Sequence, residues 1–199
     1  RKVSGKVDIF CQAGQVSVPT KHSALMGFLE PMIHPVERPR PGRLFHPKLW
    51  LLRYRRADDA VVLRLLVMSR NLTADQSWDT CVQLEGVIGS RIDPANNPIA
   101  TLIESLPGRC VADLQQHRAD GIESLVRDVR RAQWDLPEHI DSVAFHALGV
   151  GRQRAPDFSH SRAAVISPFY NSEGLARIGV GATKRPSVLI GRQEELDRL

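Results

Sequence analysis

The sequence predicts an α/β protein in which a mixed, largely parallel sheet is flanked by helices. Two β-rich apolar runs, Leu49–Tyr54 and Ala60–Met68, surround a short polar loop and predict a hairpin. From Arg162 onward the pattern is strand, helix, strand, helix, which is typical of a parallel α/β unit. A short strand followed by a helix near the N-terminus repeats the start of that order.

The first ninety residues contain four expected strands and one helix. Val7–Cys11 is a short β run, and Ser23–Ile33 has the apolar spacing of a helix that begins near Thr20 or Ser23. The segment 37–42 is rich in proline and arginine and predicts a loop that leads to Phe45. The hairpin follows this loop, and Thr80–Leu84 is the next expected strand.

The remainder of the chain divides into a helical connection and a second α/β segment. We therefore expect three parts, covering residues 1–90, 91–150 and 151–199. The expected elements after residue 90 are, in order, helices over Ile99–Leu106 and Val111–Trp134, a strand over Ile140–Leu148, a strand over Arg162–Phe169, a helix over Ser172–Ile178, a strand over Ser187–Ile190 and a helix over Gln193–Leu199.

The composition is that of a globular protein with a basic surface. The 199 residues carry a net charge of +5, which favours polyanionic partners such as nucleic acid, although ordinary solvated surface charge explains it equally well. The three cysteines are not spaced as metal ligands, so we expect reduced thiols, a cytoplasmic location and no metal or cofactor. No apolar run is long enough for a membrane span, and we expect no signal peptide and no membrane partner.

Candidate functional residues gather at the ends of the predicted hairpin strands. His46 and Lys48 precede the first strand, while Ser69 and Asn71 follow the second, and residues two apart in a strand share a face. An imidazole serves as nucleophile or general acid–base, and a lysine supplies positive charge. Serine and asparagine supply uncharged hydrogen-bond donors. Together these groups suit a phosphoryl group whose negative oxygens need stabilisation.

The same stretch resembles the phospholipase D superfamily. His46-Pro47-Lys48 matches the family's H-x-K, and Ser69-Arg70-Asn71 matches its S-x-N. The following Leu72-Thr73 and Trp78-Asp79 look like the bacterial branch with endings such as S-x-N-L-T and W-D. Two positions depart from the family pattern, because Arg53 stands where the family has Asp and Met68 where it has Gly.

The resemblance implies a phospholipase D-like half-domain in residues 1–90 and the opening of a second repeat around Val165–Phe169, incomplete at the C-terminus. It also implies a metal-independent phosphodiesterase that works through a phosphohistidine, which we expect to be a nuclease acting on DNA. The implied catalytic residues are His46 as one of two histidines, Lys48 and Asn71 on the non-bridging oxygens, Ser69 as a further donor, and Asp79 orienting His46. The expected substrate-binding residues are Arg43, Arg53 and Arg70.

Other interpretations remain open at this point. The second histidine has to come from beyond Leu199 or from a partner chain in a homodimer, because no other histidine has lysine two positions later. Arg53 in place of Asp also fits a non-catalytic nucleic-acid-binding or assembly module on the same fold. A third interpretation treats His46 and Lys48 as surface residues with no role, and lipid phosphodiesters remain an alternative substrate.

Overall fold

The structure is a computed structural model that describes residues 5–16, 24, 26–70, 76, 78–151, 156–158, 162–179 and 187–199. The chain forms two compact units, Arg1–Gln153 and Arg154–Leu199. Each unit is described separately below. The three-part organisation expected from the sequence, with a second repeat in residues 151–199, stays a prediction.

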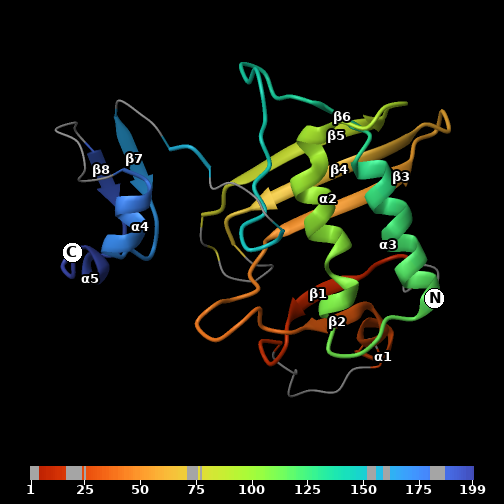
Figure 1. Cartoon of the computed structure of the whole chain (residues 1–199), viewed down its shortest axis with the longest axis horizontal. Helices are drawn as coiled ribbons and strands as arrows, with labels where there is room; N and C mark the ends of the chain where they lie inside the picture. The colour runs from red at the N-terminus through yellow and green to blue at the C-terminus, as the bar shows by residue number, and fades with distance from the viewer. Residues whose placement is uncertain are drawn as a thin grey trace. The chain divides into compact units, whose positions relative to one another are not determined.

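A four-stranded antiparallel sheet forms the centre of the first unit (Figure 1). Its strands, in spatial order, are β3 (Leu49–Arg55), β4 (Val61–Met68), β5 (Cys81–Ile88) and β6 (Ala132–Asp135). The predicted hairpin is confirmed as β3–β4, in which Leu51 lies opposite Leu65. Its connection turns at Asp59, which has a φ of 65°, a backbone conformation that aspartate tolerates better than most residues.

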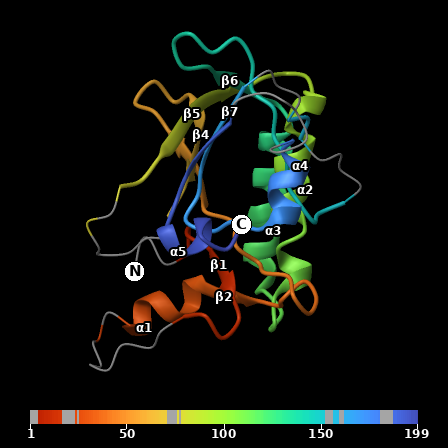
Figure 2. The ribbon, with the colours of Figure 1, turned by 90° about the vertical axis from the view of Figure 1, so that its left-hand side faces the viewer.

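Two helices, α2 (Asn97–Glu104) and α3 (Gln116–Val129), lie side by side against one face of this sheet (Figures 1 and 2). The predicted helix over Ile99–Leu106 corresponds to α2. The predicted helix over Val111–Trp134 was wrong at both ends, because α3 begins at Gln116, ends at Val129 and is followed by β6. Gly86 on β5 lies opposite Trp134 on β6. A glycine is needed there because a Cβ at this position would lie 2.9 Å from the indole of Trp134.

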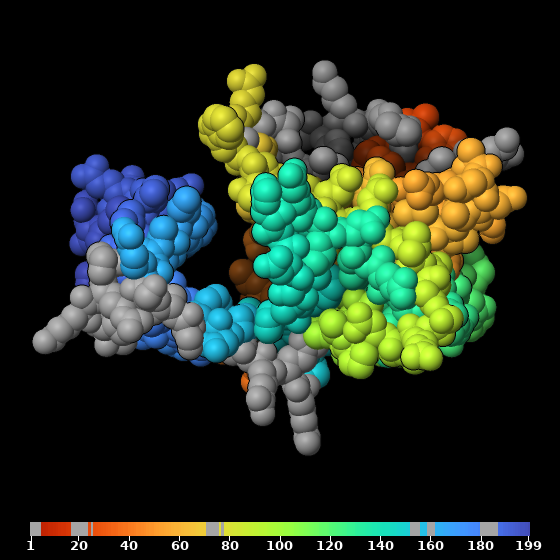
Figure 3. Space-filling model, turned by 90° about the horizontal axis from the view of Figure 1, so that it is seen from above, coloured from red at the N-terminus to blue at the C-terminus, as the bar shows by residue number. Residues whose placement is uncertain are grey.

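The segment 136–150 runs over the first unit without forming a strand, so the strand expected at Ile140–Leu148 was wrong. This segment is turquoise in Figure 3 and lies at the surface. Val143 and Phe145 pack against the core from it, and the Phe145 ring meets Trp134 edge-on at 6.1 Å. Its alternating apolar residues therefore pack as a loop and do not pair with a strand.

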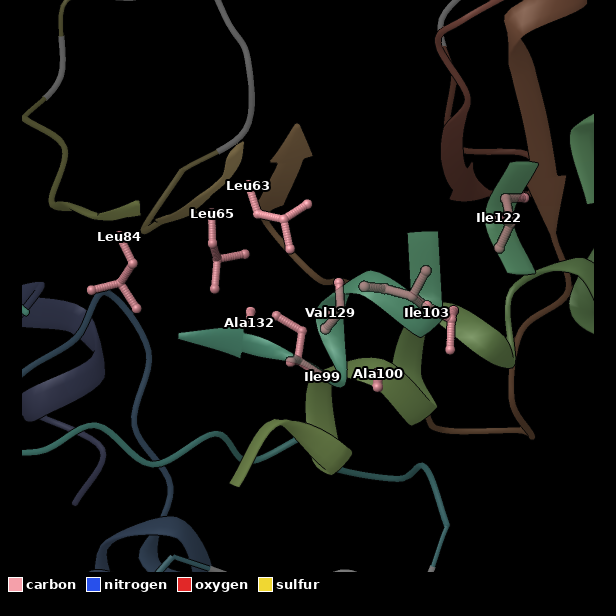
Figure 4. Packing of buried hydrophobic residues seen from close by; sticks show 10 residues of the cluster. Leu63, Leu65, Leu84, Ile99, Ala100, Ile103, Ile122, Val129 and Ala132 are labelled. Carbon is pink, nitrogen blue, oxygen red and sulfur yellow. The ribbon is translucent and has the colours of Figure 1, made fainter. Parts of the chain in front are cut away.

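The core lies between the sheet and the two helices (Figure 4). Leu63, Leu65 and Leu84 project from β4 and β5 toward Ile99 and Val129 on the helices. Leu63 and Leu65 have no exposed surface, and full burial of a leucine stabilises a fold by about 1.5–3 kcal/mol. This packing fixes which face of β3 and β4 points toward the helices.

A parallel pair of short strands forms the N-terminal part of the first unit. It consists of β1 (Ile9–Gln12) and β2 (Ile33–Val36), with α1 (Met26–Leu29) and a 3-10 turn (Glu30–Met32) between them. The helix expected at Ser23–Ile33 was wrong at its C-terminal end, because α1 ends at Leu29 and Ile33 begins β2. The strand β2 was not predicted, because its sequence, IHPV, contains a proline, a residue that disfavours strand interiors.

The second unit contains one strand–helix–strand–helix segment, as predicted. Its elements are β7 (Ala163–Ile166), α4 (Ser172–Arg177), β8 (Ser187–Ile190) and α5 (Gln193–Leu196). The strands β7 and β8 are parallel. Asn171 caps α4, since its side-chain oxygen accepts a hydrogen bond from the Gly174 amide at 2.7 Å.

The α/β class is confirmed, and the sheets are organised differently from the expectation. In the part of the chain that the structure describes, the largest sheet is antiparallel throughout, and the parallel strand pairs are β1–β2 and β7–β8. The connection from β3 to β4 is too short for the crossover that parallel neighbours need. Among the described residues, no helix is both long and apolar enough to cross a membrane.

Candidate functional site

His46 and Lys48 are in contact where the chain enters β3. The Lys48 Nζ lies 2.9 Å from Nδ1 and 3.0 Å from Nε2 of the exposed His46 ring. The lone-pair directions of the two ring nitrogens diverge, so a single ammonium does not align with both. The two distances therefore describe one close contact between the ammonium and the ring, and not two well-aligned hydrogen bonds. Partial burial also lowers the pKa of Lys48 from its ordinary value.

The backbone on both sides of His46 is anchored. The buried Phe45 donates its amide to Oε1 of the buried Gln12 at 2.9 Å, and the Met68 amide donates to the Lys48 carbonyl at 2.9 Å. Gln12 is the last residue of β1, so β1 and β4 together fix where the His46 segment runs. Sequence reasoning missed Gln12, although a polar residue directly after an apolar strand run was the available signal.

Ser69 and Asp79 lock the neighbouring end of β4 and β5. Asp79 Oδ1 accepts hydrogen bonds from the Ser69 amide at 3.0 Å and from the Ser69 hydroxyl at 2.5 Å. The Thr80 amide in turn donates to the Ser69 hydroxyl oxygen at 2.9 Å. The single hydroxyl proton of Ser69 is thus used within this lock. The described residues show no hydrogen bond between Asp79 and His46, so the orienting role assigned to Asp79 stays a prediction.

Hydrogen bonds explain the electrostatics of this lock. The hydrogen bond from the Ser69 hydroxyl makes the largest contribution to lowering the pKa of Asp79. The nearby positive charge of Arg70 lowers this pKa by a smaller amount. A lowered carboxyl pKa means that the folded protein favours the ionised form. Asp79 therefore stabilises this end of the sheet as an anion.

Replacing Ser69 by alanine is expected to lower the free energy of unfolding near neutral pH, with a deficit that shrinks in acid. The hydroxyl holds the pKa of Asp79 below its ordinary value of 3.8, so its contribution is complete above that value. The contribution is lost as the pH falls through the lower pKa of the folded state. Urea unfolding of both proteins from about pH 7 to about pH 2 measures this. A deficit that stays constant over that range would contradict the assignment.

Arg53, one of the residues predicted to bind substrate, pairs with α3. Its Nη1 lies 2.6 Å from Asp128 Oδ2 and 3.0 Å from the Ser124 hydroxyl. The Arg53 side chain is 33 % exposed and that of Asp128 15 %. The observed contacts of Arg53 therefore tie β3 to α3, and its expected role in binding substrate stays a prediction.

The pairing of Arg53 with Asp128 predicts measurable coupling between them. We expect Arg53→Met and Asp128→Asn each to destabilise the protein, and the double variant to be about 1 kcal/mol more stable than the sum of the two losses predicts. Denaturant unfolding of the parent and the three variants gives the coupling energy directly. Additive losses would show that the ion pair contributes nothing at this partly exposed site.

The remaining predicted residues lie around the same strand ends. Arg43 is exposed in the loop before Phe45, and Arg70 follows Ser69 closely enough to affect Asp79. Asn71 lies outside the described residues, as do Leu72 and Thr73. The structure thus brings His46 and Lys48 together, and Ser69, Arg70 and Asp79 together, at neighbouring strand ends.

The backbone ladder shows how these two groups are related. The hydrogen bonds from Met68 to Lys48 and from Ser69 to Thr80 extend β3, β4 and β5 by one residue. All three extensions lie at the same end of the sheet, where β3 and β5 begin and β4 ends. Neighbouring strands lie about 4.8 Å apart, so the start of β3 and the start of β5 are roughly 10 Å apart. This spacing suits an extended ligand that runs across the ends of β3, β4 and β5.

The His46 imidazole and the positive charges of Lys48 and Arg70 at these strand ends suit the recognition of an anion. Among the described residues, no cluster of three or more His, Cys, Asp or Glu side chains has the arrangement of a metal site. The chain matches no protein-family model, and comparison with curated proteins and with solved structures gave no significant match. The function is therefore argued from the site itself.

Proposed function

We propose that this chain belongs to a phospholipase D-like phosphodiesterase, a metal-independent nuclease that acts on DNA through a phosphohistidine. The observation that carries the proposal is the contact between the exposed His46 imidazole and the Lys48 ammonium at the start of β3. A nucleophilic ring beside a fixed positive charge is the minimum arrangement for attack on a phosphodiester.

In the proposed mechanism a nitrogen of His46 attacks phosphorus as the bond from phosphorus to the leaving oxygen breaks. Lys48 and Asn71 stabilise the non-bridging oxygens, on which negative charge is concentrated. The leaving oxygen takes a proton from a second histidine, which then removes a proton from water so that hydroxide releases the phosphate from His46. Each donor that is pre-aligned for such a transition state contributes about 3–4 kcal/mol.

The second histidine is assigned to a second half-site, in a continuation of the second unit or in a partner chain. Two similar strand pairs support this duplication. In β1–β2, Ile9 pairs with Ile33, and in β7–β8, Ala163 pairs with Ser187, so each parallel partner lies 24 residues later in the sequence. A helix connects the strands in both cases. This similarity also supports a phospholipase D-like arrangement of the parallel strands.

The charge distribution supports nucleic acid as the substrate class. The chain carries a net charge of +5, and the exposed loop before Phe45 contains Arg38, Arg40 and Arg43. Arginine binds phosphate through two parallel hydrogen bonds, and a basic loop beside the site attracts a polyanion. Lys48 and this loop supply the positive charge for two or more backbone phosphates.

A second candidate function is a non-catalytic nucleic-acid-binding module. Two observations favour it. Arg53 stands where the resembled family has Asp and pairs with Asp128, and the Ser69 hydroxyl donates its proton to Asp79. A site that has lost catalytic groups would keep its affinity for phosphate and lose turnover.

The test is hydrolysis of labelled single- and double-stranded DNA in EDTA by the intact protein and by its His46→Ala variant. Cleavage by the parent alone supports the proposed nuclease. Equal cleavage by both proteins removes His46 from the mechanism. Binding without cleavage favours the binding module, and neither binding nor cleavage favours lipid phosphodiesters.

A further inference from the structure

Trp78 is almost completely exposed, with 99 % of its surface accessible. Tryptophan is highly buried on average, and it is enriched at interfaces, where one part of the indole is apolar and its N–H is polar. The segment around residues 78–80, yellow in Figure 3, projects from the body of the first unit. The exposure of this indole therefore calls for an explanation.

The backbone next to Trp78 is held in place. Asp79 accepts two hydrogen bonds from Ser69, and Thr80 donates to and accepts from the same residue. The Trp78 side chain therefore extends from the backbone one residue before Asp79, whose position these hydrogen bonds fix. By contrast, Trp134 packs against Phe145 and donates its Nε1–H to Asn96 at 2.8 Å, as a structural tryptophan does.

The position of Trp78 relates it to the proposed phosphate site. Trp78 lies three residues before Cys81, the first residue of β5, and His46 lies two residues before Lys48, which precedes β3. Met68 pairs with both Lys48 and Cys81, so these two strand starts are about two strand spacings, or roughly 10 Å, apart at the same end of the sheet. Even stacked nucleotides follow one another at about 3.4 Å, and an unstacked strand is longer per nucleotide, so a short stretch of one strand is long enough to run from one of these strand starts to the other. The Arg70 cation lies near Asp79, between these strand ends.

We propose that Trp78 is a stacking platform for a nucleobase, and that the substrate of this site is single-stranded DNA. A base offers its flat face to an indole only when it is unstacked, whereas a duplex hides those faces between neighbouring base pairs. Stacking of one base on an aromatic side chain contributes about 1–3 kcal/mol and tolerates any sequence. The inference rests on the proposed function for the position of the phosphate.

The experiment measures binding of a fluorescein-labelled oligothymidine and of a mixed-sequence DNA duplex to the intact protein in EDTA. Trp78→Ala is expected to weaken binding of the single strand about tenfold and binding of the duplex less than twofold. Trp78→Phe should retain most of the affinity. Trp78→Leu is the matched control, because it keeps an apolar side chain and removes the aromatic face, and it should behave like Trp78→Ala. All three variants should melt at the temperature of the parent.

Other results would overturn the inference. These are unchanged single-strand affinity in Trp78→Ala, equal losses for strand and duplex, full affinity in Trp78→Leu, or no binding of DNA by the parent. A loss of self-association in Trp78→Ala without a loss of DNA affinity would assign the indole to a protein interface instead. Stacking without cleavage would leave the inference standing and remove the nuclease proposal, whereas His46-dependent cleavage that ignores Trp78 would do the reverse.

Discussion

Replacing His46 by alanine is expected to lower the rate of DNA cleavage in EDTA by at least about 10⁴-fold. The variant has no atom that can form the bond to phosphorus, and loss of a nucleophile costs more than loss of any single stabilising donor. His46 is exposed, and the backbone around it is held by Gln12 and Met68. The melting temperature should therefore change little, so that lost activity reports chemistry alone.

A matched histidine provides the control for this experiment. The His139 side chain is 88 % exposed, and its one described ionic contact is with the neighbouring Glu138. His139→Ala should cleave DNA at the parental rate. His46→Gln should be as inactive as His46→Ala, because an amide nitrogen is not a nucleophile at neutral pH. Retention of more than a tenth of the parental rate in either His46 variant would contradict a role for this residue as nucleophile or acid.

The parts of the fold that sequence reasoning predicted are those in which a local pattern and the tertiary environment agree. The strand β4 was recognisable from the sequence as a β-rich apolar run, and Leu63 and Leu65 within it are fully buried. The strand β8 was predicted with its observed bounds for the same reason. The contact between His46 and Lys48 follows from their spacing of two residues at a strand end.

The errors occurred where long-range packing overrides local preference. The strand β6 follows α3 after two residues, and it pairs with β5 although nothing in its four residues marks it as separate from the helix. Phe145 lies in an alternating pattern but packs its ring on Trp134 from a loop. Gln12 contacts Phe45 across 33 residues of sequence, and no local rule pairs two positions so far apart.

Replacing Asp8 by asparagine is expected to destabilise the protein by about 3 kcal/mol, the largest stability loss among the substitutions considered. Asp8 Oδ1 accepts a hydrogen bond from Arg118 at 2.5 Å and lies 2.8 Å from His34 Nε2. The Arg118 side chain is only 6 % exposed, so an amide in place of the carboxylate removes a negative charge that lies 2.5 Å from a buried guanidinium. For a unit of this size, thermal unfolding should shift downward by roughly 6–12 °C.

A second substitution separates the loss of charge balance from a loss of packing. Arg118→Met combined with Asp8→Asn removes both charges and should recover more than half of the lost stability, because a buried pair is often replaceable by apolar groups of similar volume. A double variant no more stable than Asp8→Asn would show that the carboxylate acts through His34 instead.

The same variant also separates stability from chemistry. Asp8 lies just before β1, at whose other end Gln12 fixes the Phe45 amide beside His46. Asp8→Asn should therefore retain cleavage at temperatures well below its own midpoint, since no atom of the Asp8 cluster is among the residues placed around the phosphate. A large loss of cleavage in the fully folded variant would show instead that the position of β1 sets the geometry of His46.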